Sequence, residues 1–251
     1  MHLATVFAIL IILLIIIFTS RMEHFVSQEP IYIFWTGGYD STFRLCQLLI
    51  DENKVVQPVY ISDVIDNDKN KSTRRKNIKY ELNSIKVITE KLNKKYPKTK
   101  TSLLPIIDIK KVTIDKDIQE AIRNLYKQKR MRRPVCQYGA LAQVTRDLNQ
   151  DIELSVEYAP KDSMMYRTVH DSLDCQDDLC HISHNLKEKD KPLKIFNRCI
   201  FSTIHVSKKD MLNIATKNGY QDILKLTWSC WYPVNGKPCG RCIMCHERVI
   251  K

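Results

Sequence analysis

The chain has 251 residues and a formal net charge of +12, and residues 31–251 alone are long enough for one substantial hydrophobic core. The charge suits a phosphate-rich partner such as ATP, tRNA or a membrane surface, although Lys, Asn and Ile are so frequent that an AT-rich genome explains the bias equally well. No internal repeat or low-complexity stretch is visible. No arginine-rich patch with interleaved aromatics occurs, which argues against a dedicated nucleic-acid-binding protein.

The N-terminal segment is strongly apolar. Leu3 to Thr19 is almost uninterrupted Leu, Ile, Ala, Val and Phe, at the short end of what spans a bilayer. A basic region does not precede it, and positive charge begins at Arg21, which places the following domain on the cytoplasmic side. We expect a single-pass membrane anchor over residues 1–20 and a linker over residues 21–30. Thr19-Ser20 leaves a cleaved signal sequence as the alternative.

A glycine turn lies between the first expected strand and helix. Ile31 to Trp35 is a short run of strand-forming residues, and a helical pattern with an apolar face (Phe43, Leu45, Leu48 and Leu49) follows. The turn between them reads Thr36, Gly37, Gly38, Tyr39, Asp40, Ser41 and Thr42. Glycines let the backbone approach an anion, and amide hydrogens and the helix dipole favour its charge. The turn is not a GTPase-type P-loop, because no Gly-Lys-Ser/Thr follows.

The middle of the chain alternates between strand and helix patterns. The expected strands are Val55–Ile61, Leu103–Ile109 and Ile152–Tyr158, and the expected helices are Thr73–Tyr96, Asp117–Gln128, Gln137–Leu148 and a segment from Ser207 to Gly219. Pro58 is tolerable only near a sheet edge or before pairing begins. This alternation predicts an α/β fold with a doubly wound parallel sheet covered on both faces. Ligands of such sheets bind beyond the carboxyl ends of the strands, where the glycine turn would lie.

Four cysteines close the chain. Cys230, Cys239, Cys242 and Cys245 are spaced C-x8-C-x2-C-x2-C, so two ligand pairs separated by a turn can direct four thiolates at one tetrahedral metal. Gly240 lets the chain bend between two of these ligands. We expect a closed structural zinc site without a chemical role. The alternative is four buried or disulfide-bonded cysteines.

Together the two motifs resemble a known family. The turn from Thr36 to Ser41 is similar to the Ser-Gly-Gly-x-Asp-Ser loop of the PP-loop ATP pyrophosphatases. The Thr-Trp-Ser-Cys sequence from Thr227 and the cysteine spacing resemble one branch of that group, the 7-cyano-7-deazaguanine synthases of queuosine-precursor biosynthesis. The resemblance spans about Ile31 to Lys251 and is best at the two ends.

The resemblance implies an adenine nucleotide alpha hydrolase fold and an ATP-dependent ligase. It divides the chain into a PP-loop ATP-binding domain over residues 31–226 and a zinc knuckle over residues 227–251 packed on the same domain. Residues Thr36–Thr42 would bind ATP with Mg²⁺, and Asp40 and Ser41 would be catalytic. The implied reaction adenylates the carboxylate of a deazapurine, releases pyrophosphate, and continues to an amide or nitrile.

Two central motifs depart from the family. Thr36 replaces the first serine of the loop. The Gly-Gln motif after the second strand is replaced by a basic stretch over residues 70–75, from which Arg74 and Arg75 would offset charge, with Glu81 following. Residues 133–139 replace a Pro-x-Arg-Asn stretch near the substrate, so Gln137 and Tyr138 are candidate substrate contacts. The nucleotide chemistry therefore transfers better than the identity of the acceptor.

Other functions stay open. The acceptor could be a tRNA base, or the chain could be a non-catalytic nucleotide-binding protein at a membrane. A nucleic-acid partner is not favoured, and the sequence does not predict an oligomeric state. An ATP site and a thiolate zinc site both favour a reducing compartment.

Smaller polar clusters are weaker candidates. Cys175, Cys180, His181 and His184 have the spacing of a second metal site, or are loop residues with free thiols. Cys136 would open a helix near the substrate, where a thiol has a lowered pKa, although helix packing explains it as well. Lys161, Asp162, Tyr166 and Arg167 follow an expected strand end and are substrate contacts or residues of a solvated loop.

Overall fold

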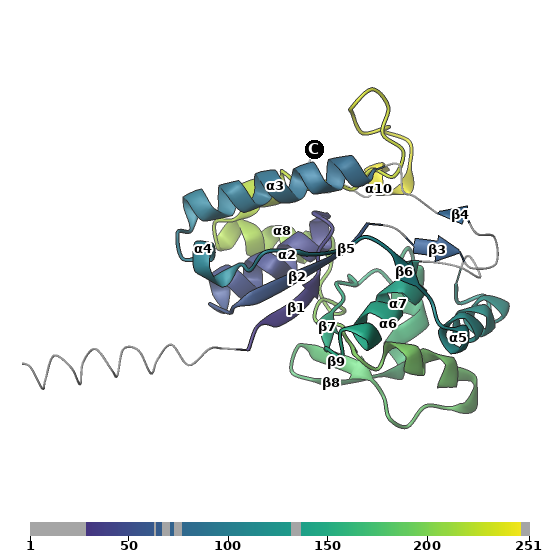
Figure 1. The fold of residues 1–251 in the computed structure, drawn as a ribbon. Coiled ribbons are helices and arrows are strands. Elements are labelled where there is room, and N and C mark those ends of the chain that lie inside the picture. The colour runs from purple at the N-terminus through teal and green to yellow at the C-terminus, as the bar shows by residue number, and fades with distance from the viewer. Residues whose placement is uncertain (1–28, 63, 67–70, 73–76, 132–136, 247–251) are drawn as a thin grey trace, which may run out of the picture. The chain divides into compact units, whose positions relative to one another are not determined.

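A computed structural model describes residues 29–246 except 63, 67–70, 73–76 and 132–136. The described residues from Ile31 onward form one compact unit (Figure 1). The expected anchor over residues 1–20 and most of the expected linker lie outside the described residues. In the part that is described, none of the helices is both long and apolar enough to cross a membrane.

The core of the fold is a five-stranded sheet in the order β10-β7-β1-β2-β5. Its strands are β1 (Ile31–Phe34), β2 (Val56–Ile61), β5 (Ile107–Ile109), β7 (Ile152–Glu153) and β10 (Cys199–Ile200). Every neighbouring pair is parallel. The chain builds outward from β1 through β2 to β5 and then returns to the other side of β1 for β7. The order therefore reverses between β1 and β7, and in open parallel sheets ligands bind beyond the carboxyl ends of the strands at such a reversal.

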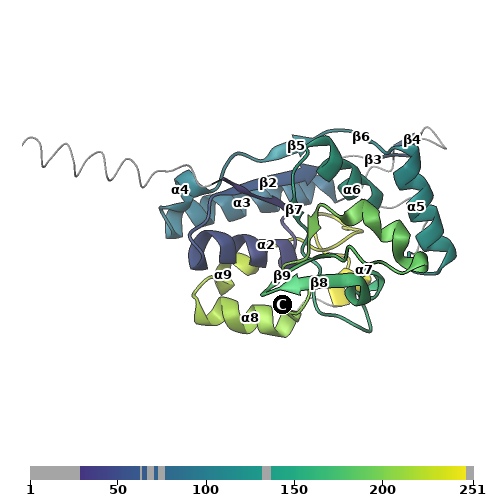
Figure 2. The same ribbon diagram turned by 90° about the horizontal axis from the view of Figure 1, so that it is seen from below.

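Helices cover both faces of the sheet, because two consecutive residues of β1 pack into two different cores. Ile33 packs into a core with Phe43 of α2 and Ile88 of α3, whereas Phe34 packs into a second core with Ile118 of α5. The first core also receives helices from the C-terminal third (Figure 2). The helices are α2 (Tyr39–Cys46), α3 (Ile78–Lys95), α4 (Thr99–Ser102), α5 (Lys116–Lys127), α6 (Gln137–Asp147), α7 (Met164–Val169), α8 (Lys208–Lys217), α9 (Gln221–Leu224) and α10 (Ile243–His246).

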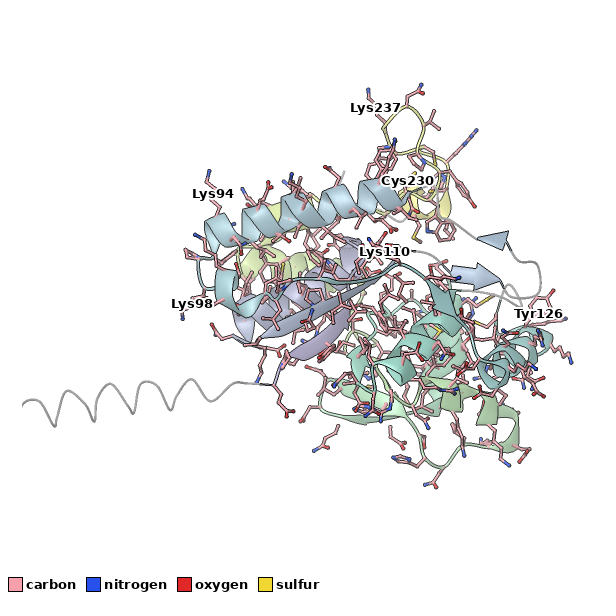
Figure 3. All side chains as sticks on the ribbon, in the orientation of Figure 1. Lys94, Lys98, Lys110, Tyr126, Cys230 and Lys237 are labelled. Carbon is pink, nitrogen blue, oxygen red and sulfur yellow. A yellow bond between two sulfur atoms is a disulfide. The ribbon has the colours of Figure 1, made fainter. Side chains whose placement is uncertain are left out.

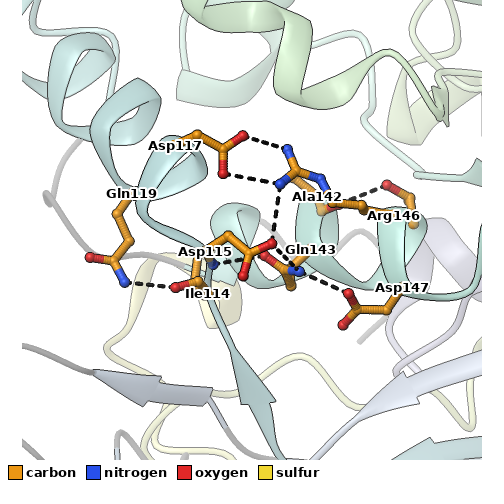
Figure 4. A network of polar contacts seen from close by, with 9 residues as sticks. Ile114, Asp115, Asp117, Gln119, Ala142, Gln143, Arg146 and Asp147 are labelled. Atoms are coloured by element: carbon orange, nitrogen blue, oxygen red, sulfur yellow. Dashed lines mark hydrogen bonds and ion pairs between the residues drawn. The ribbon is translucent and has the colours of Figure 1, made fainter.

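Helices α5 and α6 are joined by polar contacts at their surface (Figure 4). Arg146 of α6 bonds both carboxylate oxygens of Asp117 of α5, at 3.0 and 2.7 Å. The buried Gln143 accepts the backbone N–H of Asp115, the residue that precedes α5, at 2.8 Å. These bonds fix two helices that pack on the face opposite α2.

Several expected boundaries differ from the structure. α2 continues as a π-helical turn over Gln47–Asp51. α3 begins at Ile78, and residues 73–76 of the helix expected there lie outside the described residues. The strand expected from Leu103 begins at Ile107, because Thr99–Ser102 is helical and Leu103 makes only an isolated bridge to Val56. β2 is an interior strand, yet its pairing with β5 begins at Val59, just after Pro58, so no bond of that ladder is lost.

The expected strand Ile152–Tyr158 is also shorter, since β7 covers only Ile152–Glu153. The backbone beyond it still bonds β10, through Leu154 N–H to Ile200 O at 2.8 Å, and the segment after β10, through Tyr158 N–H to Val206 O at 3.0 Å. The expected helix from Ser207 is confirmed as α8. Ser207 accepts the N–H of Asp210, and Gly219 beyond the helix has φ +81°.

Two small sheets were not expected from the sequence. One has the order β4-β3-β6, formed by β3 (Val64–Asp66), β4 (Lys71–Ser72) and β6 (Val112–Thr113). The other is an antiparallel hairpin of β8 (Leu173–Gln176) and β9 (Leu179–Ile182). The remaining ordered turns are 3₁₀ segments at His170–Ser172 and Glu188–Phe196.

Candidate functional site

The glycine turn lies at the carboxyl end of β1, where the strand order reverses. Gly37 adopts φ +68°, a left-handed conformation that glycine reaches without strain. A side chain at Gly37 would stand 3.2 Å from each of the Glu81 backbone oxygen, Ser84 and Ile85 of α3. Both its conformation and its close contact with α3 therefore require glycine at this position.

Gly38 is the N-cap of α2, so it has no side chain to cover the helix N-terminus. A Cβ at Gly38 would lie 3.2 Å from Thr36 Oγ1 and 4.0 Å from Ser41 Oγ. The missing side chain thus leaves a small space between two hydroxyls, in front of N–H groups that have no acceptor within the helix. Hydroxyl groups and the amide groups at the start of a helix can donate hydrogen bonds to a phosphate oxygen, and a glycine without a side chain lets the phosphate approach the backbone.

Asp40 and Ser41 lie in the first turn of α2, and both are half-buried. Asp40 is not the helix cap, because Gly38 has that position. Burial, together with the negative charge of Asp40, raises the pKa of the neighbouring Tyr39 to about 12, and the charge of Lys208 opposes this shift. The structure therefore brings a lysine of α8 into the electrostatic surroundings of Tyr39 and Asp40.

Thr42 has a different surrounding from the one expected. Its side chain is fully buried, and its hydroxyl accepts the indole N–H of Trp35 at 3.0 Å. The bond links the end of β1 to the first turns of α2. The hydroxyl of Thr42 thus supports the turn from its buried side, in contrast to the half-buried hydroxyls of Thr36 and Ser41.

A buried ion pair fixes α2 against β7. Arg44 of α2 bonds Glu153 of β7 through two nitrogens, at 2.6 and 2.9 Å, and both side chains are at least nine-tenths buried. Ser202 donates to the same carboxylate at 2.6 Å, and Glu52 accepts from Arg44 at 2.5 Å. Bidentate geometry with satisfied oxygens is the arrangement that buried charges need. The ion pair therefore connects α2, the helix that follows β1, to β7, the strand on the other side of the reversal in strand order.

In addition to the Arg44–Glu153 pair, Lys208 was not identified as a candidate residue from the sequence. It pairs with Glu157 at 2.9 Å, and both side chains are largely buried. Glu157 follows β7, and Lys208 opens α8, so the pair joins the segment after β7 to the C-terminal third of the chain. The available signal was Glu157, a charged residue within a stretch expected to be a buried strand.

The hydroxyl groups of Tyr39 and Ser155 are buried, and neither has a hydrogen-bond partner among the described residues. Tyr39 follows β1, and Ser155 follows β7. Buried polar atoms of this kind cost free energy unless a bound molecule or water satisfies them. Both orphaned atoms therefore lie in the segments that follow β1 and β7, the two strands between which the order reverses.

The four C-terminal cysteines come together as expected. The sulfurs of Cys230, Cys239, Cys242 and Cys245 all lie within 4.8 Å of one another. No disulfide joins them, and Sγ of Cys245 is 3.5 Å from Cys242 and 3.9 Å from Cys239. Hydrogen bonds from the backbone N–H groups of Arg241 and, to a smaller extent, Cys242 lower the pKa of Cys239 to about 6, against an opposing effect of burial. Four soft donors at one point can hold a single metal ion.

A tight turn separates Cys230 from the other three cysteines of the cluster. Asn235 and Gly236 both have positive φ, at 48° and 80°, and Val234 and Lys237 pair across them. Asn-Gly is the usual sequence of such two-residue hairpin turns. Figure 3 shows Lys237 at the outer end of this projecting hairpin and Cys230 near its base.

The cysteine cluster is joined to the glycine turn. Trp228 donates its backbone N–H to the carbonyl of Gly37 at 2.9 Å, and its indole N–H to the carbonyl of Cys230, also at 2.9 Å. Ser84 of α3 donates toward both Gly37 O, at 3.2 Å, and Leu226 O, at 2.7 Å. The Trp228 ring stacks on Tyr80 with centroids 4.5 Å apart. The two motifs of the sequence therefore meet in space.

A hollow of about 510 Å³ lies beside this junction. Its lining comes from α3 and from the segment that leads into the cysteine cluster, and consists of Lys79, Tyr80, Asn83, Ser84, Val87, Leu226, Trp228 and Gly236. Its floor includes Ser84, the residue that bonds Gly37.

The other predicted residues are distributed as follows. Arg74, Arg75 and Cys136 lie outside the described residues. Gln137 is exposed in the first turn of α6, and Tyr138 packs against the core that contains Phe34. Glu81 is buried and accepts from Tyr60 at 2.7 Å and from Asn77 at 2.8 Å.

The residues after β7 have mainly local contacts. Arg167 donates to the backbone oxygens of Lys161 and Pro160, and Tyr166 packs edge-on against Tyr158 and stacks on His170. These contacts stabilise the segment around α7.

The second predicted metal cluster has a different composition. Cys175 and Cys180 form a disulfide across the β8–β9 hairpin, so the alternative of free thiols is wrong. His205 lies beside them, whereas His181 and His184 are not part of the cluster. Adjacent residues of a strand face opposite sides, so His181 is directed away from Cys180.

The fold and site together define an α/β protein with a parallel sheet, a glycine turn at the point of strand reversal and a cysteine cluster that can hold a metal. No protein-family model matches the chain, and a comparison with curated proteins finds no match either.

Proposed function

We propose that the chain is an ATP-dependent ligase of the PP-loop type, with an adenine nucleotide alpha hydrolase fold. The observation that carries the proposal is the turn from Thr36 to Ser41, where two hydroxyls and the start of α2 surround a bare Gly38 at the reversal of strand order. Phosphates bind at such positions in parallel sheets.

In the proposed reaction, Gly37, Gly38 and Ser41 hold the pyrophosphate part of ATP. Asp40 is the carboxylate of the turn and would bind magnesium, which offsets the negative charge of the phosphates. A carboxylate oxygen of the acceptor attacks the α-phosphorus, the bond to pyrophosphate breaks, and an acyl-adenylate forms. Ammonia then attacks the acyl carbon and AMP leaves. Activation of the resulting amide by a second ATP would lead to a nitrile, with a deazapurine acid as the proposed acceptor.

The C-terminal cysteines have a structural role in this proposal. Zinc bound by Cys230, Cys239, Cys242 and Cys245 holds the segment whose Trp228 N–H bonds Gly37 O. The chemistry itself takes place at the turn. Zinc thus orders the turn without contacting the substrate.

The test measures the pyrophosphate that the protein releases from ATP in the presence of Mg²⁺ and each member of a panel of deazapurine carboxylic acids. We expect release with at least one acid, and Asp40→Ala should lower it at least about a hundredfold, because a transition-state charge contact is lost. Zinc content should stay unchanged in this variant. Asp178→Ala, in the exposed turn between β8 and β9, is the matched control and should retain full activity.

Full pyrophosphate release by Asp40→Ala would refute the proposed chemistry. Binding of ATP without any turnover on the acceptor panel would instead favour the non-catalytic nucleotide-binding alternative at a membrane.

One observation favours a different acceptor, such as a tRNA base. Trp231 and Tyr232 in the projecting hairpin are 43% and 52% exposed. Residues 223–246 contain Lys225, Lys237 and Arg241 but no acidic residue. Exposed aromatics with cations can stack on unpaired bases and contact phosphates. Bulk tRNA therefore belongs in the acceptor panel, and Trp231→Ala should reduce turnover only if tRNA is the acceptor.

A further inference from the structure

The β8–β9 hairpin contains a sulfur site that the proposed ligase chemistry does not use. Cys175 and Cys180 occupy directly opposite positions of its two strands and are joined by a disulfide. Cys175 is exposed, whereas Cys180 is fully buried. The two sulfurs therefore differ strongly in their access to solvent.

A histidine from another segment lies against both sulfurs. Nε2 of His205 is 3.5 Å from Sγ of Cys175 and 3.4 Å from Sγ of Cys180. His205 follows β10 and is exposed. The three potential ligand atoms lie within 4.8 Å of one another. One imidazole and two sulfurs from separate parts of the fold thus converge at one point.

We propose that reduction of the Cys175–Cys180 disulfide opens a second metal site, in which both thiolates and His205 bind zinc or a similarly soft divalent cation. Two cysteines and one histidine are a known type of zinc ligand set, and three protein ligands leave a fourth position for water or an external ligand. The site is distinct from the C-terminal cluster, whose four sulfurs are not bonded to one another.

Two molecules of an external thiol can reduce the Cys175–Cys180 disulfide. A thiolate attacks the exposed Sγ of Cys175, the Cys175–Cys180 bond breaks, and Cys180 leaves as a thiolate beside His205, whose imidazole can transfer a proton to it. A second thiol attacks the mixed disulfide at its external sulfur and releases Cys175 as a thiol. The two electrons reduce the protein disulfide and form one external disulfide. Zinc then replaces the protons of the two thiols.

The backbone keeps the ligands together after reduction. Hairpin pairing extends on both sides of the Cys175–Cys180 pair, from Leu173 with Ile182 to Gln176 with Leu179. Phe201 N–H bonds Cys180 O at 2.8 Å, which ties β9 to the segment that carries His205. Only a separation of the two sulfurs is needed to turn the disulfide into a chelating pair.

The test is the zinc content of the full chain, measured by plasma mass spectrometry after equilibration with zinc and removal of the excess. We expect about one zinc per chain in the oxidised protein and about two after treatment with a phosphine reductant, the first being held by the C-terminal cluster. His205→Ala and Cys175→Ser should hold about one under both conditions. His184→Ala is the matched control and should still gain the second zinc on reduction.

A fully reduced wild type that holds one zinc would overturn the proposal, and so would a His205→Ala variant that gains the second. Because His205 is exposed, its replacement leaves the core intact, so the result does not depend on the stability of Cys175→Ser. Cobalt substitution adds an independent measurement, since thiolate-to-cobalt absorption should increase on reduction in wild type and not in Cys175→Ser. Neither measurement depends on ATP.

Discussion

Cys199 is a thiol in the centre of the fold. It lies on β10 and is fully buried, and burial raises its pKa from 9.0 to about 12, with the charge of Asp151 adding to the effect. In the unfolded chain the thiol ionises near its ordinary pKa, whereas in the folded chain it stays protonated to a much higher pH. The stability from this group is therefore complete below pH 9 and is lost as the pH rises from about 9 toward 12.

We expect the free energy of unfolding to fall by about 1.4 kcal/mol per pH unit in that window for each such thiol. Cys199→Ala should remove this contribution from the slope, while its cavity lowers stability equally at every pH. Urea unfolding of wild type and variant at pH 8, 9, 10 and 11 measures the difference. Parallel pH profiles would show that Cys199 does not keep its proton in the folded chain.

Single residues also show where sequence reasoning stops. The spacing of the four cysteines predicted their cluster, because ligand geometry follows from short distances along the chain. The pair of Arg44 and Glu153 was not predicted, since 109 residues separate its members. A glutamate inside an expected buried strand signalled that a cation was required, but not which one.

At the scale of an element, the turn between β1 and α2 can be compared with the turn between Val234 and Lys237, because each contains a glycine with a left-handed backbone. Gly37 and Gly236 both have left-handed backbone, with φ +68° and +80°. A Cβ at Gly37 would contact α3 at 3.2 Å, whereas a Cβ at Gly236 would have nothing within 4 Å. Replacement by alanine therefore causes conformational strain at both positions and steric crowding only at the first.

We expect Gly236→Ala to cost about 1 kcal/mol of stability, because only the backbone conformation is penalised. Gly37→Ala should cost about 2–4 kcal/mol, since overpacking against α3 is added. Thermal and urea unfolding of the two variants measure the difference. Equal losses would mean that α3 yields to the added methyl group without cost.

Regular elements were predictable where their pattern was long enough. The series from β1 through α2 to β2 was predicted, and so were α5, α6 and α8, because each has a clear periodicity or cap. β10 was missed because it has two residues and its strand character comes from pairing with β7. The β8–β9 hairpin was missed because an acidic segment resembles a loop until its partner strand is known.

At the scale of the whole molecule, the beginning and end of the compact unit meet at one carbonyl. Gly37 O accepts from Trp228 near the C-terminus and from Ser84 of α3. A metal bound by the four cysteines would fix Cys230, two residues beyond Trp228. Removal of such a metal should therefore loosen the turn from Thr36 to Ser41, where we expect ATP to bind.

We expect a chelator to weaken the affinity for a non-hydrolysable ATP analogue by about tenfold, or about 1.4 kcal/mol, comparable to the loss of one backbone hydrogen bond. Added zinc should restore it. Calorimetric titration of the oxidised protein measures the change without a contribution from the β8–β9 site. Cys242→Ser should show the same loss without rescue by zinc. Unchanged affinity in the metal-free protein would mean that the turn is stable by itself.

The site as a whole was predicted at its two ends and not between them. The turn and the cysteine cluster are local motifs, and the sequence alone contains their geometry. Their junction depends on Ser84, Tyr80 and Trp228, which only tertiary packing brings together. Lys208 reaches Glu157 for the same reason.

The two bonds to Gly37 O also have a consequence for biosynthesis. Translation delivers Gly37 well before Trp228, and 190 further residues are synthesised in the period between them. During most of that period the turn has its contacts with α3 and lacks its C-terminal partner. A truncated chain that ends before Trp228 would thus contain every strand of the main sheet, but its turn would lack the hydrogen bond from Trp228 to Gly37 O.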